Sequence, residues 1–397
     1  MKRFTTLLTA SAIILMLFCS VKPAAQTLTP SEPLTAINLP ENVPGQPDKD
    51  WYIEQVQQIG VANKVPIIQV AYKTKDRKFC FETANFDFVD ASPDCSTVFQ
   101  VASISKVVFS YIVMRLVDKG VIDLDKPLYE YTGGVVEERF RDAVPGKAKS
   151  SAQNEEWAKL LTARIIFTHG SGLPNWAGTR ETRGKAKLVF KHKPDTKFLY
   201  SGEGIHYLQR VVEHITGKTL NELAEQEVFG PLGMVSSSYK WRKEYNIIHA
   251  FGYNPNNEKV EQRGTKLAEN AAYTLRTNVK DFSLFLEALM EGRGLKRETF
   301  EEMVSPQRST NESNTVFFGL GIRVTPNSNL DYGPMWHHSG SNGDNYRAMF
   351  WIFPKMQSYC IYFTNSGNGG KGGTREQLYE LFFPQYPDAE YNSEHHL

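Results

Sequence analysis

A serine and a lysine three residues apart, Ser103 and Lys106, could carry out covalent chemistry. If the chain is helical here, residues at this spacing lie on one face, about 5–6 Å apart. A serine hydroxyl becomes an effective nucleophile only when a base removes its proton. A lysine can be that base if desolvation or a nearby cation lowers its pKa from about 10.4. Ser103 at a helix N-terminus would also have free backbone N–H groups beside it, which suit a developing oxyanion.

This spacing alone is weak evidence, because Ser-x-x-Lys recurs by chance and serine is a common helix cap. The residues that follow favour the catalytic interpretation. An apolar run continues from Val107 to Val117, and Gly120 ends it. The predicted helix is therefore buried, and the lysine in its first turn is expected in a protected site.

The segment FQVASISK at residues 99–106 resembles the Ser-x-x-Lys segment of class C β-lactamases, D,D-carboxypeptidases and related esterases. The resemblance extends from about residue 50 to about residue 383, and further segments occur in the family's order. They are GVIDLDKPL (120–128), IIFTHGSGLP (165–174), Tyr200-Ser201-Gly202 in the place of Tyr-Ser-Asn or Tyr-Ala-Asn, and His338-Ser339-Gly340 in the place of Lys-Thr-Gly.

The resemblance implies a role for each matching residue. Ser103 would form an acyl-enzyme, and Lys106 would hold or accept its proton. Tyr200 would relay protons to and from the leaving group. The oxyanion hole would consist of the backbone N–H groups of Ser103 and Ser341. The other matching positions would bind the substrate, namely Ser201, His338, Ser339 and Gly340.

Two positions depart from the family pattern. His338 stands where a lysine helps to recognise a substrate carboxylate, and histidine is mostly neutral at neutral pH. Gly202 stands where an asparagine bonds the substrate's amide, and glycine has no side chain to do so. The departures favour ester or peptide hydrolysis over β-lactam hydrolysis. His337 is expected on the opposite strand face, in a structural role.

The elements that must position these residues can be predicted from periodicity. A helix is expected over 50–62, followed by strands over 65–72 and 79–88. Helical periodicity dominates 103–292, with a polar loop over 132–156. Strands return over 317–324, 346–353 and 358–364, before a helix over 375–383. This order predicts an α+β fold of the β-lactamase/transpeptidase type. An antiparallel sheet built from both chain ends would be flanked by helices and joined by a large, mainly helical insertion.

The first residues predict export. A basic start, an apolar run over 7–18 and small residues before Gln26 indicate a signal peptide over 1–25. Five prolines over 26–49 predict an extended tether, followed by the hydrolase domain over 50–383 and a tail over 384–397. A retained membrane anchor is the alternative to a cleaved signal. Lipidation at Cys19 is a further open alternative, disfavoured by the bulky Phe18 before it.

Composition narrows the expected partners. The net charge of +1 indicates neither nucleic acid nor an anionic membrane. No paired histidine or Cys-x-x-Cys spacing points to a metal, so neither metal nor cofactor is expected. Cys80 and Cys95 could form a disulfide in an exported protein, and whether they do stays open. Cys360 lies in an apolar strand and is expected in the core.

The sequence thus predicts a periplasmic or secreted serine hydrolase without stable membrane insertion. Its substrate would be a small molecule or peptide, with a cell-wall fragment as one possible source. Two alternatives remain at this point. One is a penicillin-binding D,D-carboxypeptidase or β-lactamase. The other is a non-catalytic muropeptide-binding homologue, which has no need for an activated nucleophile.

Overall fold

The computed structural model describes residues 39–92, 94–141, 150–179, 182, 184–260, 267–326, 331–370 and 372–386 of the 397-residue chain. The expected signal peptide, Cys19, residues 26–38 of the expected tether and the tail from residue 387 lie outside these ranges.

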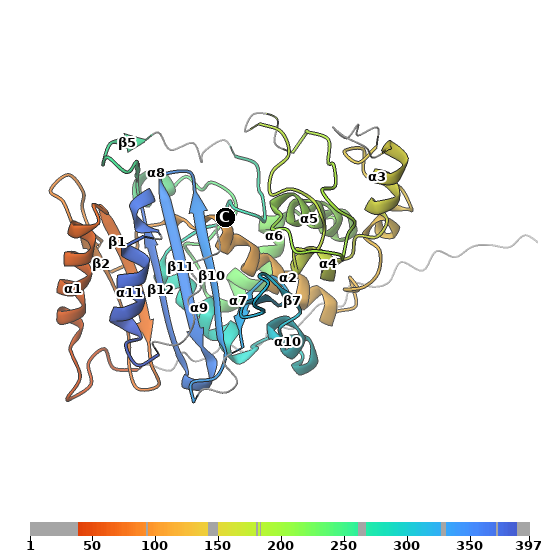
Figure 1. Cartoon of the computed structure of the whole chain (residues 1–397). Coiled ribbons are helices and arrows are strands. Elements are labelled where there is room, and N and C mark those ends of the chain that lie inside the picture. Colours follow the sequence, from red (N-terminus) through yellow and green to blue (C-terminus); the bar gives the residue numbers. More distant parts are fainter. Residues whose placement is uncertain are drawn as a thin grey trace, which may run out of the picture. The chain divides into compact units, whose positions relative to one another are not determined.

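An antiparallel sheet of eight strands combines the two ends of the chain (Figure 1), in the order β2-β1-β12-β11-β10-β9-β8-β7. The strand β1 (Ile67–Lys73) pairs with β2 (Lys78–Ala84) on one side and with β12 (Ser358–Thr364) on the other. Further along are β11 (Tyr346–Phe353), β10 (Met335–Asn342), β9 (Arg323–Thr325), β8 (Phe317–Phe318) and β7 (Arg308–Ser309). The predicted sheet from both chain ends is confirmed.

One predicted strand is interrupted. The expected strand over 317–324 is divided into β8 and β9, because the chain between them turns inward. Gly321 has a φ of +81°, and a Cβ there would lie 2.6 Å from the Cβ of Ser110. Its backbone N–H bonds the carbonyl of Phe167. The strand prediction is wrong over residues 319–322, because these residues form the turn between the antiparallel strands β8 and β9. The apolar Leu320 and Ile322 of this turn pack in the core that contains α2.

Helices cover both faces of the sheet. On one face, α1 (Lys49–Ala62) and α11 (Thr374–Phe382) pack together, with Tyr52 stacked on Phe382 at 5.3 Å. On the other face lie α9 (Val279–Glu291) and the helix that follows Ser103, α2 (Ser105–Asp118). Strand side chains alternate between the two cores, so that Phe350 packs against Phe282 of α9 while Met349 and Trp351 pack toward α1 and α11.

The middle of the chain forms the predicted, mainly helical insertion, seen beside the sheet in Figure 1. Its helices are α3 (Ser151–Ala158), α4 (Ala163–Phe167), α5 (Gly202–Thr216), α6 (Leu220–Ala224), α7 (Gly230–Leu232) and α8 (Tyr245–Ile248). Helix α10 (Arg297–Val304) follows α9. Among the described residues, periodicity misses β10 and five short strands, which are β7 and β3 (Phe99–Gln100), β4 (Gly252–Tyr253), β5 (Lys259–Val260) and β6 (Arg276–Thr277). The expected loop over 132–156 is wrong at its end, because Ser150 caps α3 by accepting from the N–H of Gln153.

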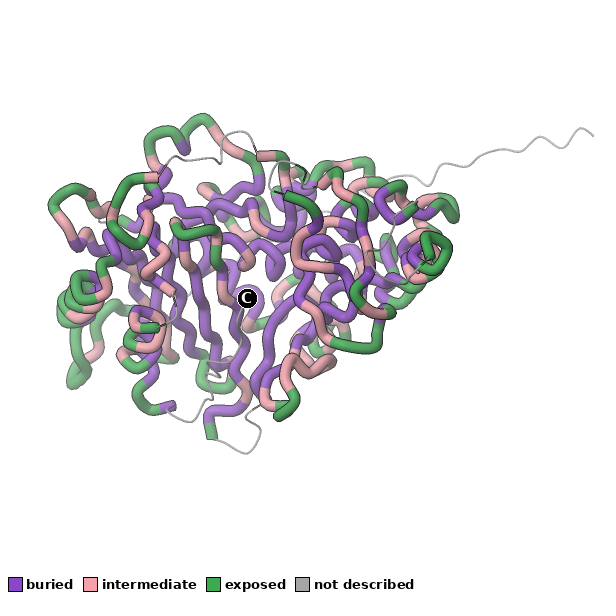
Figure 2. Tube along the Cα trace, turned by 45° about the horizontal axis from the view of Figure 1, so that its top comes forward, coloured by how far each residue is buried: buried purple, intermediate pink, exposed green. Residues whose placement is uncertain are grey.

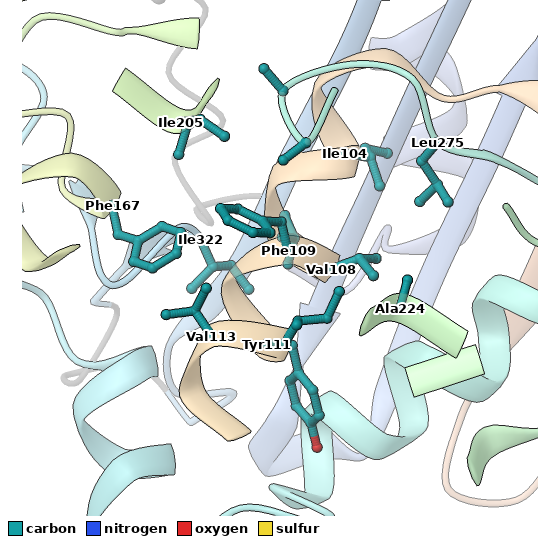
Figure 3. Close-up of a cluster of buried hydrophobic side chains, with 14 of the residues drawn as sticks. Ile104, Val108, Phe109, Tyr111, Val113, Phe167, Ile205, Ala224, Leu275 and Ile322 are labelled. Carbon is teal, nitrogen blue, oxygen red and sulfur yellow. The ribbon is translucent and has the colours of Figure 1, made fainter. Parts of the chain in front are cut away.

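Helix α2 is almost wholly buried, and Figure 3 shows the apolar side chains that surround it. In Figure 2, buried residues line the inner segments of the chain and exposed residues lie mainly in the outer turns and helices. Most of the side chains of α2 are apolar, and buried residues occur on all of its faces, a pattern typical of an interior helix. Phe109 packs against Phe167 at 6.0 Å between ring centroids, and Leu275 lies across the helix from them (Figure 3). The expectation of a buried helix after Ser103 is confirmed. Every polar group at its first turn therefore lies inside the protein.

Three findings concern the described residues alone. None of their helices is both long and apolar enough to cross a bilayer. They contain no group of three or more His, Cys, Asp or Glu side chains placed to share a metal ion. Their cysteines are free thiols: Cys360 is in the core as expected, and Cys80 and Cys95 form no disulfide.

Candidate active site

A tight turn presents Ser103 to the space beside the sheet. Strand β3 leads into a short 3-10 helix, Ala102–Ile104, which continues into α2. Ala102 has a left-handed φ of +46°, which is uncommon for a residue with a side chain. Ser105 stabilises the turn, because its hydroxyl donates to the Ala102 carbonyl at 2.5 Å and accepts from the Leu275 N–H at 3.0 Å. The backbone strain at Ala102 is therefore supported by buried hydrogen bonds.

Lys106 lies directly behind Ser103. Its Nζ is 3.0 Å from the Ser103 Oγ and donates to the Ala272 carbonyl at 2.7 Å. The side chain is 1% exposed. Burial, and then the positive charge of Arg323, hold the pKa of Lys106 well below its ordinary value of 10.5. Both conditions that a lysine base requires, proximity and a lowered pKa, are present.

Tyr200 completes this group from the insertion. The Lys106 Nζ lies 4.9 Å from the centroid of its ring. Burial raises the pKa of Tyr200 to about 12, against opposing effects of the Ser103 hydroxyl and the Arg323 charge. Its hydroxyl is enclosed, and it has no hydrogen bond of good geometry to a described residue. At neutral pH Tyr200 is therefore a protonated phenol beside a lysine that readily loses its proton.

His169 holds the segment that carries Tyr200. Its Nδ1 accepts from the Ser201 N–H at 3.1 Å, its carbonyl accepts from the Leu199 N–H at 2.8 Å, and its ring lies 4.2 Å from the Tyr200 ring. Burial, followed by the charge of Lys106, lowers the pKa of His169 well below 6.5. The ring is therefore neutral and acts as an acceptor. No spacing rule indicates this role, because the contact links residues about thirty positions apart.

The edge of β10 forms the opposite wall of the site. β10 pairs with β9 through Met335, Trp336 and His337, and beyond His337 no described strand pairs with this edge. A Cβ on Gly340 would lie 2.3 Å from the Val101 carbonyl oxygen, so only glycine lets the strand pass this close to the nucleophile turn. Ser339 is half-buried, and Ser341 is exposed.

The ring of His338 points into this interior, while His337 lies on the other strand face with its Nε2 3.3 Å from the Thr325 hydroxyl. The Nδ1 of His338 is 2.8 Å from the Ser339 carbonyl, which can only accept, so the neutral ring carries its proton there. Its Nε2 is enclosed without a partner among the described residues. Burial, and then the charge of Arg323, lower the pKa of His338 well below 6.5. A neutral histidine thus replaces the cation of the family pattern.

The residues around position 202 explain why a glycine is found there. A Cβ there would lie 2.8 Å from a ring carbon of Trp176 and 2.9 Å from the Asn175 carbonyl oxygen. The Asn175 Oδ1 accepts from the Gly202 N–H at 3.0 Å. Residues 175 and 176 therefore occupy the space that a side chain at position 202 would need. The Ser201 hydroxyl caps α5 at the Gly204 N–H and donates to the Pro174 carbonyl, so a substrate contact through it remains a prediction.

Arg323 is a residue of this site that the sequence analysis missed. It is 6% exposed, and its guanidinium carbon lies 5.3 Å from the centroid of the Phe318 ring. Its charge contributes to the pKa shifts of Lys106, Tyr200 and His338. An arginine in an ordinary strand pattern carries no signal of this kind in the sequence.

Known proteins resemble this chain in sequence and in fold. The model of a protein family described as beta-lactamase matches residues 89–382. Penicillin-binding protein 4 of Amycolatopsis lactamdurans is 30% identical over 151 residues, which are 36% of this chain and 36% of the relative. The N-acetylmuramyl-L-alanine amidase of Bacillus subtilis is 28% identical over 317 residues, 70% of this chain and 64% of that protein. The chain thus spans about a third and just under two thirds of these relatives. The structure of a class C beta-lactamase superposes with a TM-score of 0.67 and 16% identity, covering 85% of this chain and 96% of that one.

Proposed function

Because the chain belongs to the beta-lactamase family, we propose that it is an exported serine hydrolase that cleaves an ester or a peptide bond through an acyl-enzyme on Ser103. The observation that carries the proposal is the contact between the Lys106 Nζ and the Ser103 Oγ, 3.0 Å apart in a buried site. Export rests on the basic and apolar start of the sequence.

The opposite pKa shifts of two groups suggest their roles. Lys106, with its lowered pKa, is the base: its neutral amine takes the Ser103 proton as Oγ attacks the substrate carbonyl. Tyr200, with its raised pKa, is the acid: it gives a proton to the departing alcohol or amine and recovers one from Lys106. The carbonyl oxygen becomes an oxyanion held by the N–H groups of Ser103 and Ser341.

Deacylation repeats these steps with water. A water molecule loses a proton to the Tyr200–Lys106 pair and attacks the acyl carbon, after which Ser103 leaves and regains its proton. The products are a carboxylic acid and the released alcohol or amine. The cycle consumes one water and restores every protein group. Ser339, His338 and Gly340 would line the substrate along the free edge of β10, and Ser201 would act near Tyr200.

Ester or peptide bonds are favoured over β-lactams by two substitutions. His338 is neutral, so it cannot anchor a carboxylate by charge. Asn175 and Trp176 fill the space beside Gly202, so no side chain at that position can contact an acyl amide. A penicillin-binding D,D-carboxypeptidase is the second candidate, motivated by the similarity to penicillin-binding protein 4. For either function a small or peptide substrate derived from the cell wall is proposed.

The test is intact-mass analysis of the purified protein after exposure to p-nitrophenyl acetate and, separately, to benzylpenicillin. The proposal expects a transient adduct of one acetyl group on Ser103, with steady ester turnover and little penicilloyl adduct. The variant Ser103→Ala should form no adduct, and its kcat should be at least about 1000-fold lower than that of the wild-type protein. The reason is that the nucleophile and its base act as one unit, so Lys106 has no catalytic function without the Ser103 hydroxyl.

The controls decide among the alternatives. Circular dichroism must show that Ser103→Ala is folded, and Ser313→Ala, at an exposed position in a surface turn, should retain full activity. A lasting penicilloyl adduct would shift the conclusion to a penicillin-binding carboxypeptidase. An absence of adducts from both reagents in folded wild-type protein would favour a non-catalytic binding homologue.

A further inference from the structure

Two cysteines lie on the same face of the sheet, beside its edge strand β2. Cys80 is in the middle of β2, and the residues on either side of it, Phe79 and Phe81, point into the aromatic core toward α1 and α11. Cys80 therefore faces the opposite core and packs against it. Cys95 is a fully buried member of that same core. Cys360 belongs to the aromatic core, so the sheet lies between it and the other two.

The segment that carries Cys95 is held to β2 by Glu82, two residues beyond Cys80 and therefore on the same face. The Glu82 Oε1 accepts from the Ser92 N–H and from the Thr97 hydroxyl, each at 2.9 Å. Ser92 and Thr97 stand on either side of Cys95 along the chain. The Cys95 N–H bonds the Ser92 carbonyl at 3.1 Å, in a turn with a left-handed φ of +57° at Cys95. These bonds keep Cys95 over the part of β2 that contains Cys80.

The two thiols also act on each other. The largest influence on the pKa of each thiol is the other thiol, which lowers the pKa of Cys80 and raises that of Cys95. For Cys360 burial alone raises the pKa. In disulfide exchange the attacking group is the thiolate, which forms more readily when the pKa is lowered. Cys80 is also the more exposed of the pair, so it is the thiol that an oxidant reaches first.

We propose that Cys80 and Cys95, free thiols in the structure, are joined by a disulfide in the exported protein, with a disulfide donor as the oxidant. The Cys80 thiolate attacks one sulfur of the donor, and the first donor thiolate leaves. Cys95 then loses its proton and attacks the Cys80 Sγ, which releases the second donor thiolate. The two protein thiols are oxidised, the donor is reduced, and its two thiolates take up the two protons. The inference rests on the proposed export, because disulfides persist in oxidising compartments.

The position of this disulfide gives it a structural purpose. An edge strand such as β2 is hydrogen-bonded to a neighbouring strand on one side only. The disulfide would connect this edge to the segment that continues through β3 to Ser103. It would also close the loop over residues 80–95, and a closed loop stabilises the fold by restricting the unfolded chain.

The test maps the thiols of the full chain, purified without reductant from the exported fraction of expressing cells, before and after incubation with oxidised glutathione. Free thiols are alkylated in denaturant, and the protein is cleaved with trypsin. Both cysteines fall in one peptide, residues 79–106, because no lysine or arginine lies between Lys78 and Lys106. We expect this peptide to escape alkylation and to be lighter than its reduced form by two hydrogen atoms, while Cys360 is alkylated.

Thermal unfolding with and without reductant measures the effect of the bond. In wild-type protein the reductant should lower the Tm by about 3–8 °C. It should have no effect on the double variant Cys80→Ala, Cys95→Ala. Cys360→Ala is the matched control, which also removes one thiol and should keep both the disulfide and the response to reductant. The peptide map of wild-type protein decides the question even if the double variant does not fold.

Alkylation of both cysteines in folded protein after incubation with oxidised glutathione would overturn the proposal. A lasting glutathione adduct on Cys80, or a bond from either cysteine to Cys360, would overturn it as well. None of these measurements depends on hydrolase activity, so a protein without esterase activity can still show the disulfide. Export is checked separately by the loss of residues 1–25 in the intact mass. A chain that keeps these residues in the cytosol and closes the pair only with glutathione would contradict export while supporting the pairing.

Discussion

The pKa values of Lys106 and Tyr200 are displaced in opposite directions by the same cause, burial, which penalises the charged form of each. A cation and an anion respond in opposite directions, so one enclosed site produces a base and an acid. Arg323 strengthens the shift of Lys106 and opposes that of Tyr200. The chemistry therefore depends on three side chains that must stay dry and close together.

This arrangement predicts the pH dependence of ester hydrolysis. Lys106 must be neutral to act as the base, so kcat/KM should fall as the pH decreases through its lowered pKa. Tyr200 must be protonated, so activity should fall again only as the pH approaches about 12. A pH–rate profile with a substrate that does not ionise measures both limbs. Arg323→Gln should move the acidic limb to higher pH, because it removes a cation that disfavours protonated Lys106. An acidic limb above pH 10 in wild-type protein would contradict this assignment.

At the scale of elements, the site depends on how closely β10 approaches the turn before α2. The Gly340 Cα faces the Val101 carbonyl with no room for a side chain. The strand and the nucleophile turn are thus positioned by one backbone contact. The distance between Ser103 and the Ser341 N–H follows from that contact.

Gly340→Ala should therefore impair acylation more than it impairs folding. Its Cβ would lie 2.3 Å from an oxygen, and relieving such a clash costs about 1–3 kcal/mol of stability. Displacing the turn should slow labelling of Ser103 by a fluorophosphonate about 10- to 100-fold. Gly343→Ala is the control, because its φ is +55° with nothing near its Cβ. It should cost about 1 kcal/mol and leave labelling unchanged. Labelling of Gly340→Ala at the wild-type rate would refute the role of this contact.

At the scale of the whole domain, the two faces of the sheet differ in function: one carries the candidate site and the other forms a structural core. The face toward α2 and the insertion carries the site, while the face toward α1 and α11 is an aromatic core. Phe382 is 1% exposed there and lies against Tyr52 and Tyr72. This core closes the sheet by joining the first helix to the last.

Phe382→Ala should lower stability by about 3–5 kcal/mol, the usual cost of removing a buried phenylalanine. Thermal or urea unfolding monitored by circular dichroism measures the loss. Activity per mole of labelled Ser103 should stay at the wild-type value at temperatures where the variant is folded. Ile247→Ala, at a position 88% exposed, should change stability by less than about 0.5 kcal/mol. A loss below 1 kcal/mol for Phe382→Ala would show that this core contributes little.

Features encoded by neighbouring residues could be predicted from the sequence alone. The spacing of Ser103 and Lys106 placed both on one helical turn, and the apolar run after them predicted burial. Continuous apolar runs identified β11 and β12 with the observed bounds, because strands buried on both faces have no polar alternation to obscure them. The family segments predicted the fold and brought Tyr200 and His338 to the same place.

Only the tertiary structure decided the features that depend on distant segments. Arg323, His169 and the pair of Asn175 with Gly202 act through contacts across strands and loops. The division into β8 and β9 arose because Gly321 turns toward α2. The pKa shifts of Lys106, Tyr200, His169 and His338 also depend on contacts between distant segments. The physical reason is that periodicity reports the environment of a residue along its own element, whereas desolvation and unpaired charge depend on everything packed around it.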